Sequence, residues 1–143
     1  LGLLNAIAVG EADGHKLFEA WAETTADEVL RQVLRVVAIR EAEHAAVFTK
    51  RIAELGFSVR EKKNNTFQNR LELARSDSSD KKKFKKILGI GKKPRLEDRF
   101  ADVFLDTSID PITSALLGRY VAEERDSGRL LREARRALRS ESA

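Results

Sequence analysis

Two stretches of this chain repeat each other at a fixed spacing, and the repeat restricts the folds open to it. When residues 24–41 are aligned on residues 107–124, the polar segment 24–27 falls on segment 107–110. Apolar residues then recur at helical spacing in both stretches. Polar residues directly before an apolar run of this period mark the start of an amphipathic helix. The repeat therefore predicts two helical hairpins in the same register.

The apolar periodicity predicts four long helices, and no segment alternates like a β-strand. The helices are expected over residues 1–22, from 28 to about 55, from 94 to about 106, and from 111 to about 138. Two short-looped hairpins joined by a longer link favour a four-helix bundle. We therefore expect an all-α fold and a single domain over residues 1–143, with an insert of short helices at about 57–93.

Composition excludes several classes of protein. The chain has no cysteine, which rules out disulfides, thiolate catalysis, iron–sulfur clusters and cysteine-based zinc sites. It contains no apolar run of membrane-spanning length and no secretory signal, so we expect a soluble, cytoplasmic protein. It begins at Leu1 within an apolar-periodic segment, which suggests a fragment or the loss of a disordered leader.

Each predicted helix carries one glutamate on or beside its apolar stripe. These residues are Glu11, Glu41, Glu97 and Glu124, and His44 follows Glu41 by three positions, on the same side of its helix. A carboxylate inside an apolar bundle must be protonated, paired or bound to a metal ion. Four glutamates and a histidine form a ligand set suited to iron or manganese. The alternative is that some of them are solvated, as most charged residues at helical spacing are.

Other polar residues near these stripes are expected to have structural roles. Glu43 and Glu123 lie off the apolar stripes, so we expect both to be solvated. His15 follows Glu11 by about one turn and is interpreted as a surface or helix-packing histidine. Tyr120 is interpreted as a core tyrosine bonded to a carboxylate.

The Glu41-Ala42-Glu43-His44 motif, Glu11 and the repeated hairpin together resemble the ferritin-like superfamily, particularly its rubrerythrin-like branch. The resemblance covers nearly the whole chain except residues 60–93. It implies a four-helix bundle that binds two metal ions. One glutamate would come from each of the first and third helices, and a Glu-x-x-His motif from each of the second and fourth. Such centres oxidise Fe(II), reduce peroxide or activate dioxygen.

Carried over residue by residue, the resemblance makes Glu11, Glu41, His44 and Glu124 metal ligands. Glu97 matches loosely, because it is displaced by about one turn from the repeat position of Glu11. The chain departs from the pattern at Ser127, where the family would have its second histidine. A serine hydroxyl stays protonated near neutral pH and is a poor ligand for Fe(II) or Mn(II).

The insert is strongly basic. Residues 60–95 hold thirteen Lys or Arg and four Asp or Glu, a net charge of +9, whereas the rest of the chain is at −5. The segment Lys81–Arg95 could bind nucleic acid, an anionic membrane or an acidic partner. The favoured interpretation is that Phe84, Ile87 and Leu88 dock on the bundle and the lysines face solvent.

Three functions stay open at the level of the sequence. The first is an iron- or manganese-dependent oxidoreductase of peroxidase or ferroxidase type, with metal ions as its partners. The second is a degenerate bundle that has lost its metal centre and serves as a binding or assembly module. The third is a binder of nucleic acid or anionic membrane through residues 81–95. We also expect a homodimer, and the sequence assigns no catalytic residue.

Overall fold

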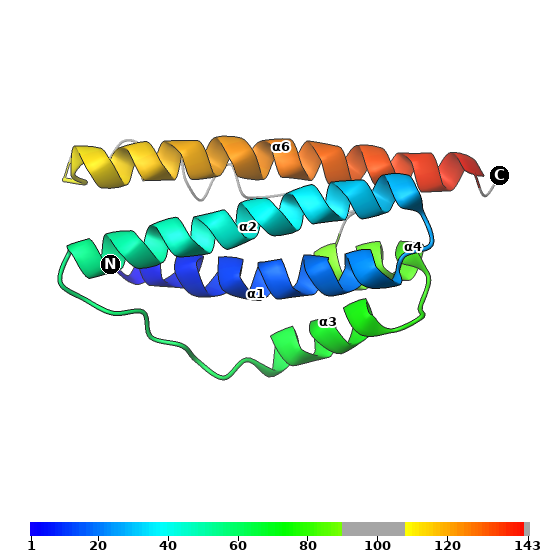
Figure 1. Cartoon of the computed structure of the whole chain (residues 1–143), viewed down its shortest axis with the longest axis horizontal. Helices are drawn as coiled ribbons and strands as arrows, with labels where there is room; N and C mark the ends of the chain where they lie inside the picture. Colours follow the sequence, from blue (N-terminus) through cyan, green and yellow to red (C-terminus); the bar gives the residue numbers. More distant parts are fainter. Residues whose placement is uncertain (90–107, 142–143) are drawn as a thin grey trace.

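The computed structural model describes residues 1–89 and 108–141, and all regular structure in these ranges is helical. The elements are α1 (Gly2–Thr24), α2 (Glu28–Glu54), α3 (Asn65–Arg75), α4 (Asp80–Lys83), the π-helical turn η1 (Phe84–Leu88) and α6 (Pro111–Glu141). Figure 1 shows α1, α2 and α6 running alongside one another. The all-α prediction is confirmed. The predicted third long helix, residues 94 to about 106, lies outside the described residues.

Two aspartates that the repeat aligns form the N-caps of α2 and α6. The Oδ1 atom of Asp27 accepts a hydrogen bond from the backbone N–H of Leu30 at 2.9 Å. Asp110 Oδ1 accepts one from the backbone N–H of Thr113, also at 2.9 Å. Each aspartate satisfies a backbone donor that has no partner within its helix. The helices α2 and α6 therefore begin in the same way.

The core consists of two apolar clusters with a layer of polar side chains between them. One cluster contains Leu4, Ile7, Ala8, Phe48, Ile52, Leu117, Tyr120 and Val121, and the other includes Leu17, Phe18, Trp21, Leu34, Val37, Leu131 and Ala134. Along α1, α2 and α6 alike, the buried residues between these sets are all polar: Glu11, Glu41, His44 and Ser127. The fold thus places ionisable groups between two apolar clusters.

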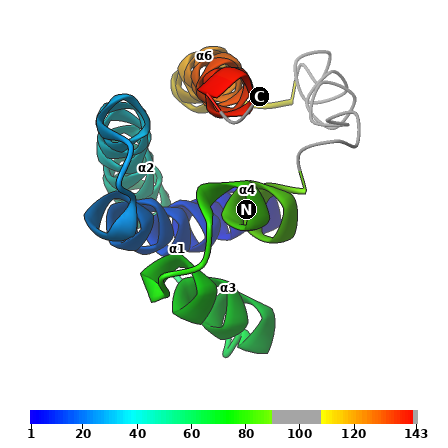
Figure 2. The same ribbon diagram turned by 90° about the vertical axis from the view of Figure 1, so that its right-hand side faces the viewer.

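The described part of the insert packs against α1 and adds apolar residues to one of the two clusters. Both views place α3 on the side of α1 that faces away from α6 (Figures 1 and 2). Phe84 of η1 is fully buried and meets the ring of Trp21 edge-on, with centroids 4.8 Å apart. Ile87 is buried as well, and Leu88 packs against the same cluster. The predicted docking of these apolar residues on the bundle is confirmed.

Within the described part of the segment Lys81–Arg95, the expected exposure of the lysines holds with one exception, and Lys92 and Lys93 lie outside the described residues. Lys81, Lys82, Lys85 and Lys86 are exposed, but Lys83 is buried, so the prediction is wrong for that residue. Its ammonium group donates hydrogen bonds to Thr24 Oγ1 at 2.7 Å and to the backbone carbonyls of Ala74 and Ser76 at 3.0 and 2.7 Å. Since these acceptors end α1 and α3, the cation also lies at the negative ends of two helix dipoles.

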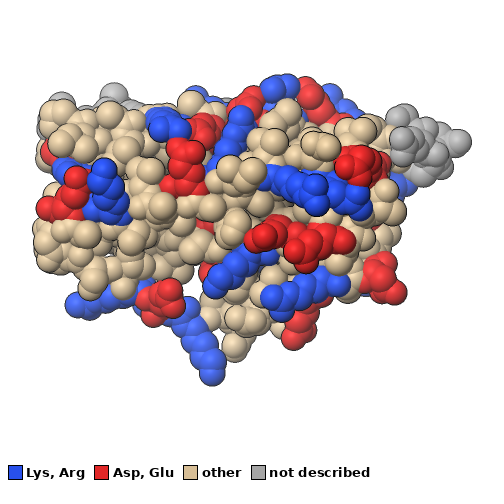
Figure 3. Space-filling view, viewed as in Figure 1, with Lys and Arg blue, Asp and Glu red and all other residues tan. Residues whose placement is uncertain are grey.

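The outer surface of α2 and α6 carries charges of both signs. Figure 3 shows Lys and Arg side chains next to Asp and Glu across this face. Arg129 of α6, for example, lies 2.8 Å from Asp126 and 3.0 Å from Glu133. Among the described residues, no helix is both long enough and apolar enough to span a membrane.

We expect Lys83→Ala to lower the free energy of unfolding by about 2–3 kcal/mol, because it leaves buried acceptors without a donor. Lys82→Ala is the matched control, because Lys82 is its exposed neighbour on the same short helix. It should change the free energy by less than about 0.5 kcal/mol. Urea unfolding of both variants measures the difference, and equal midpoints would show that the buried ammonium group has no stabilising role.

Candidate metal centre

The polar layer brings together one ligand-type side chain from each of α1, α2 and α6. Glu11 Oε1 lies 2.8 Å from His44 Nδ1, and Glu124 Oε1 lies 3.6 Å from the same nitrogen. One potential ligand atom from each of the three residues falls within 4.8 Å of the other two. Glu11 and His44 are buried and Glu124 is half-buried. Three residues that the sequence predicts as ligands therefore meet around one point.

Glu41 belongs to the same layer, and a glycine makes room for it. A Cβ atom added to Gly14 on α1 would lie 1.8 Å from Glu41 Oε2 and 2.8 Å from its Cδ. The carboxyl group of Glu41 thus lies directly against the backbone of α1. Any larger residue at Gly14 would have to displace it.

The close packing of these carboxyl groups changes their protonation. Burial raises the pKa of Glu41 well above the usual value, and the charge of Glu11 and a hydrogen bond with it add to the increase. Burial raises the pKa of Glu124 as well. Burial by itself would lower the pKa of His44, but its hydrogen bonds with Glu11 and Glu124 and the charge of Glu11 raise it to about 9. Without another cation, the layer therefore holds protons on Glu41 and His44 near neutral pH.

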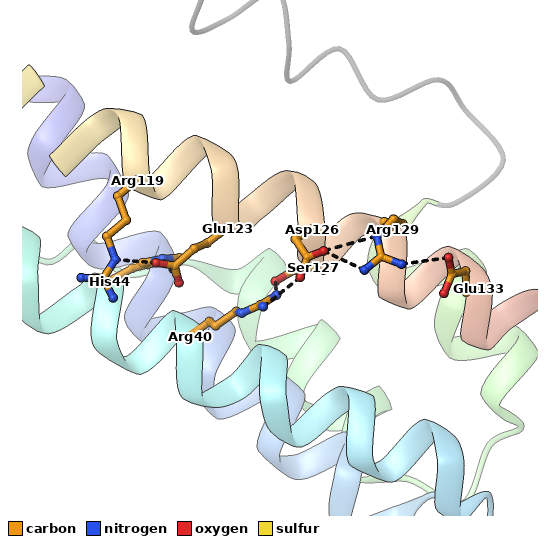
Figure 4. A network of polar contacts seen from close by, with 8 residues as sticks. All are labelled: Arg40, His44, Arg119, Glu123, Asp126, Ser127, Arg129 and Glu133. Carbon is orange, nitrogen blue, oxygen red and sulfur yellow. Dashed lines mark hydrogen bonds and ion pairs between the residues drawn. The ribbon is translucent and has the colours of Figure 1, made fainter. Parts of the chain in front are cut away.

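The two ring nitrogens of His44 face different surroundings. Nδ1 faces Glu11 and Glu124, whereas Nε2 lies 3.3 Å from Glu123 Oε2 without forming a hydrogen bond. Figure 4 shows Glu123 held in turn by Arg119, whose Nε donates to Glu123 Oε1 at 2.7 Å. Burial would raise the pKa of Glu123, but Arg119 and His44 hold it below its usual value. A metal-binding histidine commonly directs its second nitrogen to such a carboxylate.

A different set of contacts surrounds Ser127, which replaces the expected second histidine. Arg40 Nη1 on α2 donates a hydrogen bond to Ser127 Oγ at 3.1 Å, and its Nη2 lies 2.8 Å from Asp126 Oδ2 (Figure 4). Ser127 is buried, and the guanidinium group of Arg40 offers no lone pair to a metal. This side of the layer therefore supplies a fixed positive charge in place of a second imidazole.

The remaining site predictions have mixed outcomes. Glu97 lies outside the described residues. His15 lies at the edge of the bundle, where its Nδ1 is 3.0 Å from the backbone oxygen of Ala38 and its Nε2 is 3.2 Å from Glu19, as expected of a helix-packing histidine. Tyr120 is buried in the core, as predicted, and packs edge-on against His44 with centroids 5.1 Å apart.

The prediction for Glu123 is wrong. Its side chain is only 21% exposed, because it bends from the edge of α6 toward His44 instead of extending into water. Glu43 is exposed as predicted and pairs with Arg119. The sequence held one signal for Glu123, since Arg119 precedes it by four residues, the spacing of a helical ion pair. That spacing identifies the pair but not the contact with a second helix.

In comparisons with family models, curated proteins and solved structures, nothing matches this chain.

The role of Gly14 can be tested against Gly10, which lies one turn earlier on α1. A Cβ atom added to Gly10 meets nothing within 4 Å, so Gly10→Ala should raise the free energy of unfolding by about 0.5–1 kcal/mol through helix propensity. Gly14→Ala should not gain this stability and should be the less stable of the two by about 1 kcal/mol or more, because it displaces a buried carboxyl group. Thermal and urea unfolding measure both, and equal stabilisation would contradict the close contact with Glu41.

Proposed function

We propose that this chain is a ferritin-like metal-binding protein, in which a buried centre holds iron or manganese and supports oxidoreductase chemistry of the peroxidase or ferroxidase type. In this proposal the described helices α1, α2 and α6 belong to a four-helix bundle. Glu11, His44 and Glu124 would bind the ion, and Glu41 would contribute a further carboxylate beside them.

The observation that carries the proposal is the convergence of Glu11, His44 and Glu124 from three helices, with ligand atoms within 4.8 Å of one another. These residues are separated by long stretches of sequence, yet the fold points them at one another between two apolar clusters. The carboxyl groups of Glu11, Glu41 and Glu124 interact there, and two of them, those of Glu11 and Glu124, contact the imidazole of His44. A divalent cation would balance the charge that protons on Glu41 and His44 otherwise balance.

The donor set fits the proposed ion. Carboxylate oxygens and an imidazole nitrogen suit Fe(II) and Mn(II), and no soft sulfur ligand is present in the chain. Glu123 and Arg119 would orient His44 so that Nδ1 points to the carboxylates. When bound, such an ion supplies a centre that can exchange electrons with oxygen or peroxide. The apolar clusters on both sides would limit the access of water to it.

A second candidate function is favoured by a specific contact. Because Arg40 donates a hydrogen bond to Ser127, this part of the layer needs no metal ion to satisfy its polar groups, and the ion pair of Glu11 with His44 would be structural as well. The protein would then be a degenerate ferritin-like bundle that acts as a binding or assembly module.

Binding of nucleic acid or an anionic membrane through residues 81–95 and formation of a homodimer remain predictions.

The metal proposal predicts that His44→Gln weakens Mn(II) binding about 100-fold, because glutamine is a poor substitute for a ligating imidazole. His15→Gln is the matched control, since His15 is the other histidine of the chain and its ring nitrogens contact Ala38 and Glu19. It should leave the affinity unchanged. Calorimetric titration measures binding, and far-UV circular dichroism checks that both variants fold. Equal affinities in the two variants, or no binding by the wild type, would refute the proposal.

Glu41→Leu separates the metal proposal from the metal-free alternative. If the centre binds metal, Mn(II) at about 100 times its Kd should stabilise the wild type by about 2.7 kcal/mol and the variant by far less. If the bundle is metal-free, Mn(II) should stabilise neither protein. The leucine should then raise the free energy of unfolding, because it replaces a buried carboxyl group with an apolar one of similar size. Unfolding curves with Mn(II) and with a chelator measure both effects.

A further inference from the structure

The repeat relates the two contact sets on either side of the polar layer. The alignment that places Glu41 on Glu124 also places Arg40 on Glu123 and His44 on Ser127. We call His44 with Glu123 the first half-site, and Ser127 with Arg40 the second half-site.

Both half-sites join α2 and α6, but the two helices exchange roles between them. In the first, His44 of α2 faces Glu123 of α6 at 3.3 Å. In the second, Ser127 of α6 accepts a hydrogen bond from Arg40 of α2 at 3.1 Å. In each half-site, the residue three positions after the layer glutamate of one helix contacts the residue one position before the layer glutamate of the other helix. These glutamates are Glu41 on α2 and Glu124 on α6. The two contacts occupy equivalent positions in the repeated hairpins.

The chemistry of the two half-sites is opposite. The first offers an imidazole nitrogen, with a carboxylate behind it that can orient the ring. The second offers a hydroxyl group and a guanidinium group, which has no lone pair to donate and stays charged at every relevant pH. Both positions differ together: the second half-site has a weak ligand and a cation, whereas the first has an imidazole and its acidic partner.

The second half-site is also firmly held. Ser127 is buried, and the Arg40 side chain is only 26% exposed. The second nitrogen of its guanidinium group pairs with Asp126 at 2.8 Å. Asp126 is in turn bound by Arg129 at 2.8 Å, so Arg40 is one member of a network along α6 (Figure 4). A cation that approached Ser127 would be repelled by the fixed positive charge of Arg40 and would find no histidine to bind it.

We propose that the centre binds one divalent cation per chain, on the side of His44, and that Arg40 and Ser127 prevent a second cation from binding at the equivalent position. This inference rests on the proposed function. It differs from the two-ion centre that the ferritin-like resemblance implies, and it assigns Arg40 the role of a permanent cation in place of a metal. The one-ion centre consists of Glu11, His44 and Glu124, with Glu41 beside them.

The number of ions tests the inference directly. Mn(II) is the probe, because it is stable in air, and its binding is followed by calorimetry and by elemental analysis after desalting. The wild type is expected to bind one equivalent. Two equivalents would overturn the one-ion inference and leave the proposed function intact. No binding at all would overturn the proposed function, and the inference with it.

A double variant tests the roles of Arg40 and Ser127. Arg40→Glu with Ser127→His gives the second half-site the same residue types as the first, and it should raise the stoichiometry from one to two. Ser127→Ala is the control, since it removes the hydroxyl without adding a ligand, and it should stay at one. Circular dichroism checks folding. A folded double variant that still binds one equivalent would show that Arg40 and Ser127 are not what closes the second position.

Discussion

The contact between Glu11 and His44, deep between two helices, is the interaction on which the rest of this site depends. A buried carboxylate is costly unless a cation or a proton offsets its charge, and this bundle buries two and half-buries a third at one level. In the part of the chain that the structure describes, His44 is the only buried histidine available to them. Hydrogen bonds within the layer, raised pKa values of Glu41, His44 and Glu124, and a glycine at position 14 accommodate these groups. Each of these features results from the need to accommodate the same polar layer.

The apolar clusters on either side explain how the layer is held in register. The cluster near the start of α1 fixes the end of α2 and the beginning of α6, where Arg51 also pairs with Asp110 at 2.8 Å. At the opposite end, the insert contributes Phe84 and the buried Lys83 to the core. The insert thus has a structural role whatever its exposed lysines bind. With both ends packed, the ligand-type side chains between them have little freedom to separate.

Helical periodicity in the sequence was sufficient to predict α1, α2 and α6. It was also sufficient to predict that Glu11, His44 and Glu124 share an interior, since each lies on an apolar stripe. It was insufficient for side chains that start at the edge of a helix and reach across to a neighbour. Glu123, Arg40 and Lys83 are of this kind, because periodicity gives the direction of the Cβ atom and not the position of a distant charged group. The importance of Gly14 likewise depends on a contact with another helix.

The most direct test of a metal centre is the anomalous diffraction of crystals grown with Mn(II). We expect one strong peak per chain, bonded to Nδ1 of His44 and to carboxylate oxygens of Glu11 and Glu124, with Arg40 still hydrogen-bonded to Ser127. A map with no peak in the polar layer, in crystals that diffract well and contain excess Mn(II), would show that the layer is not a metal centre. It would leave the buried carboxyl groups and His44 as a structural network.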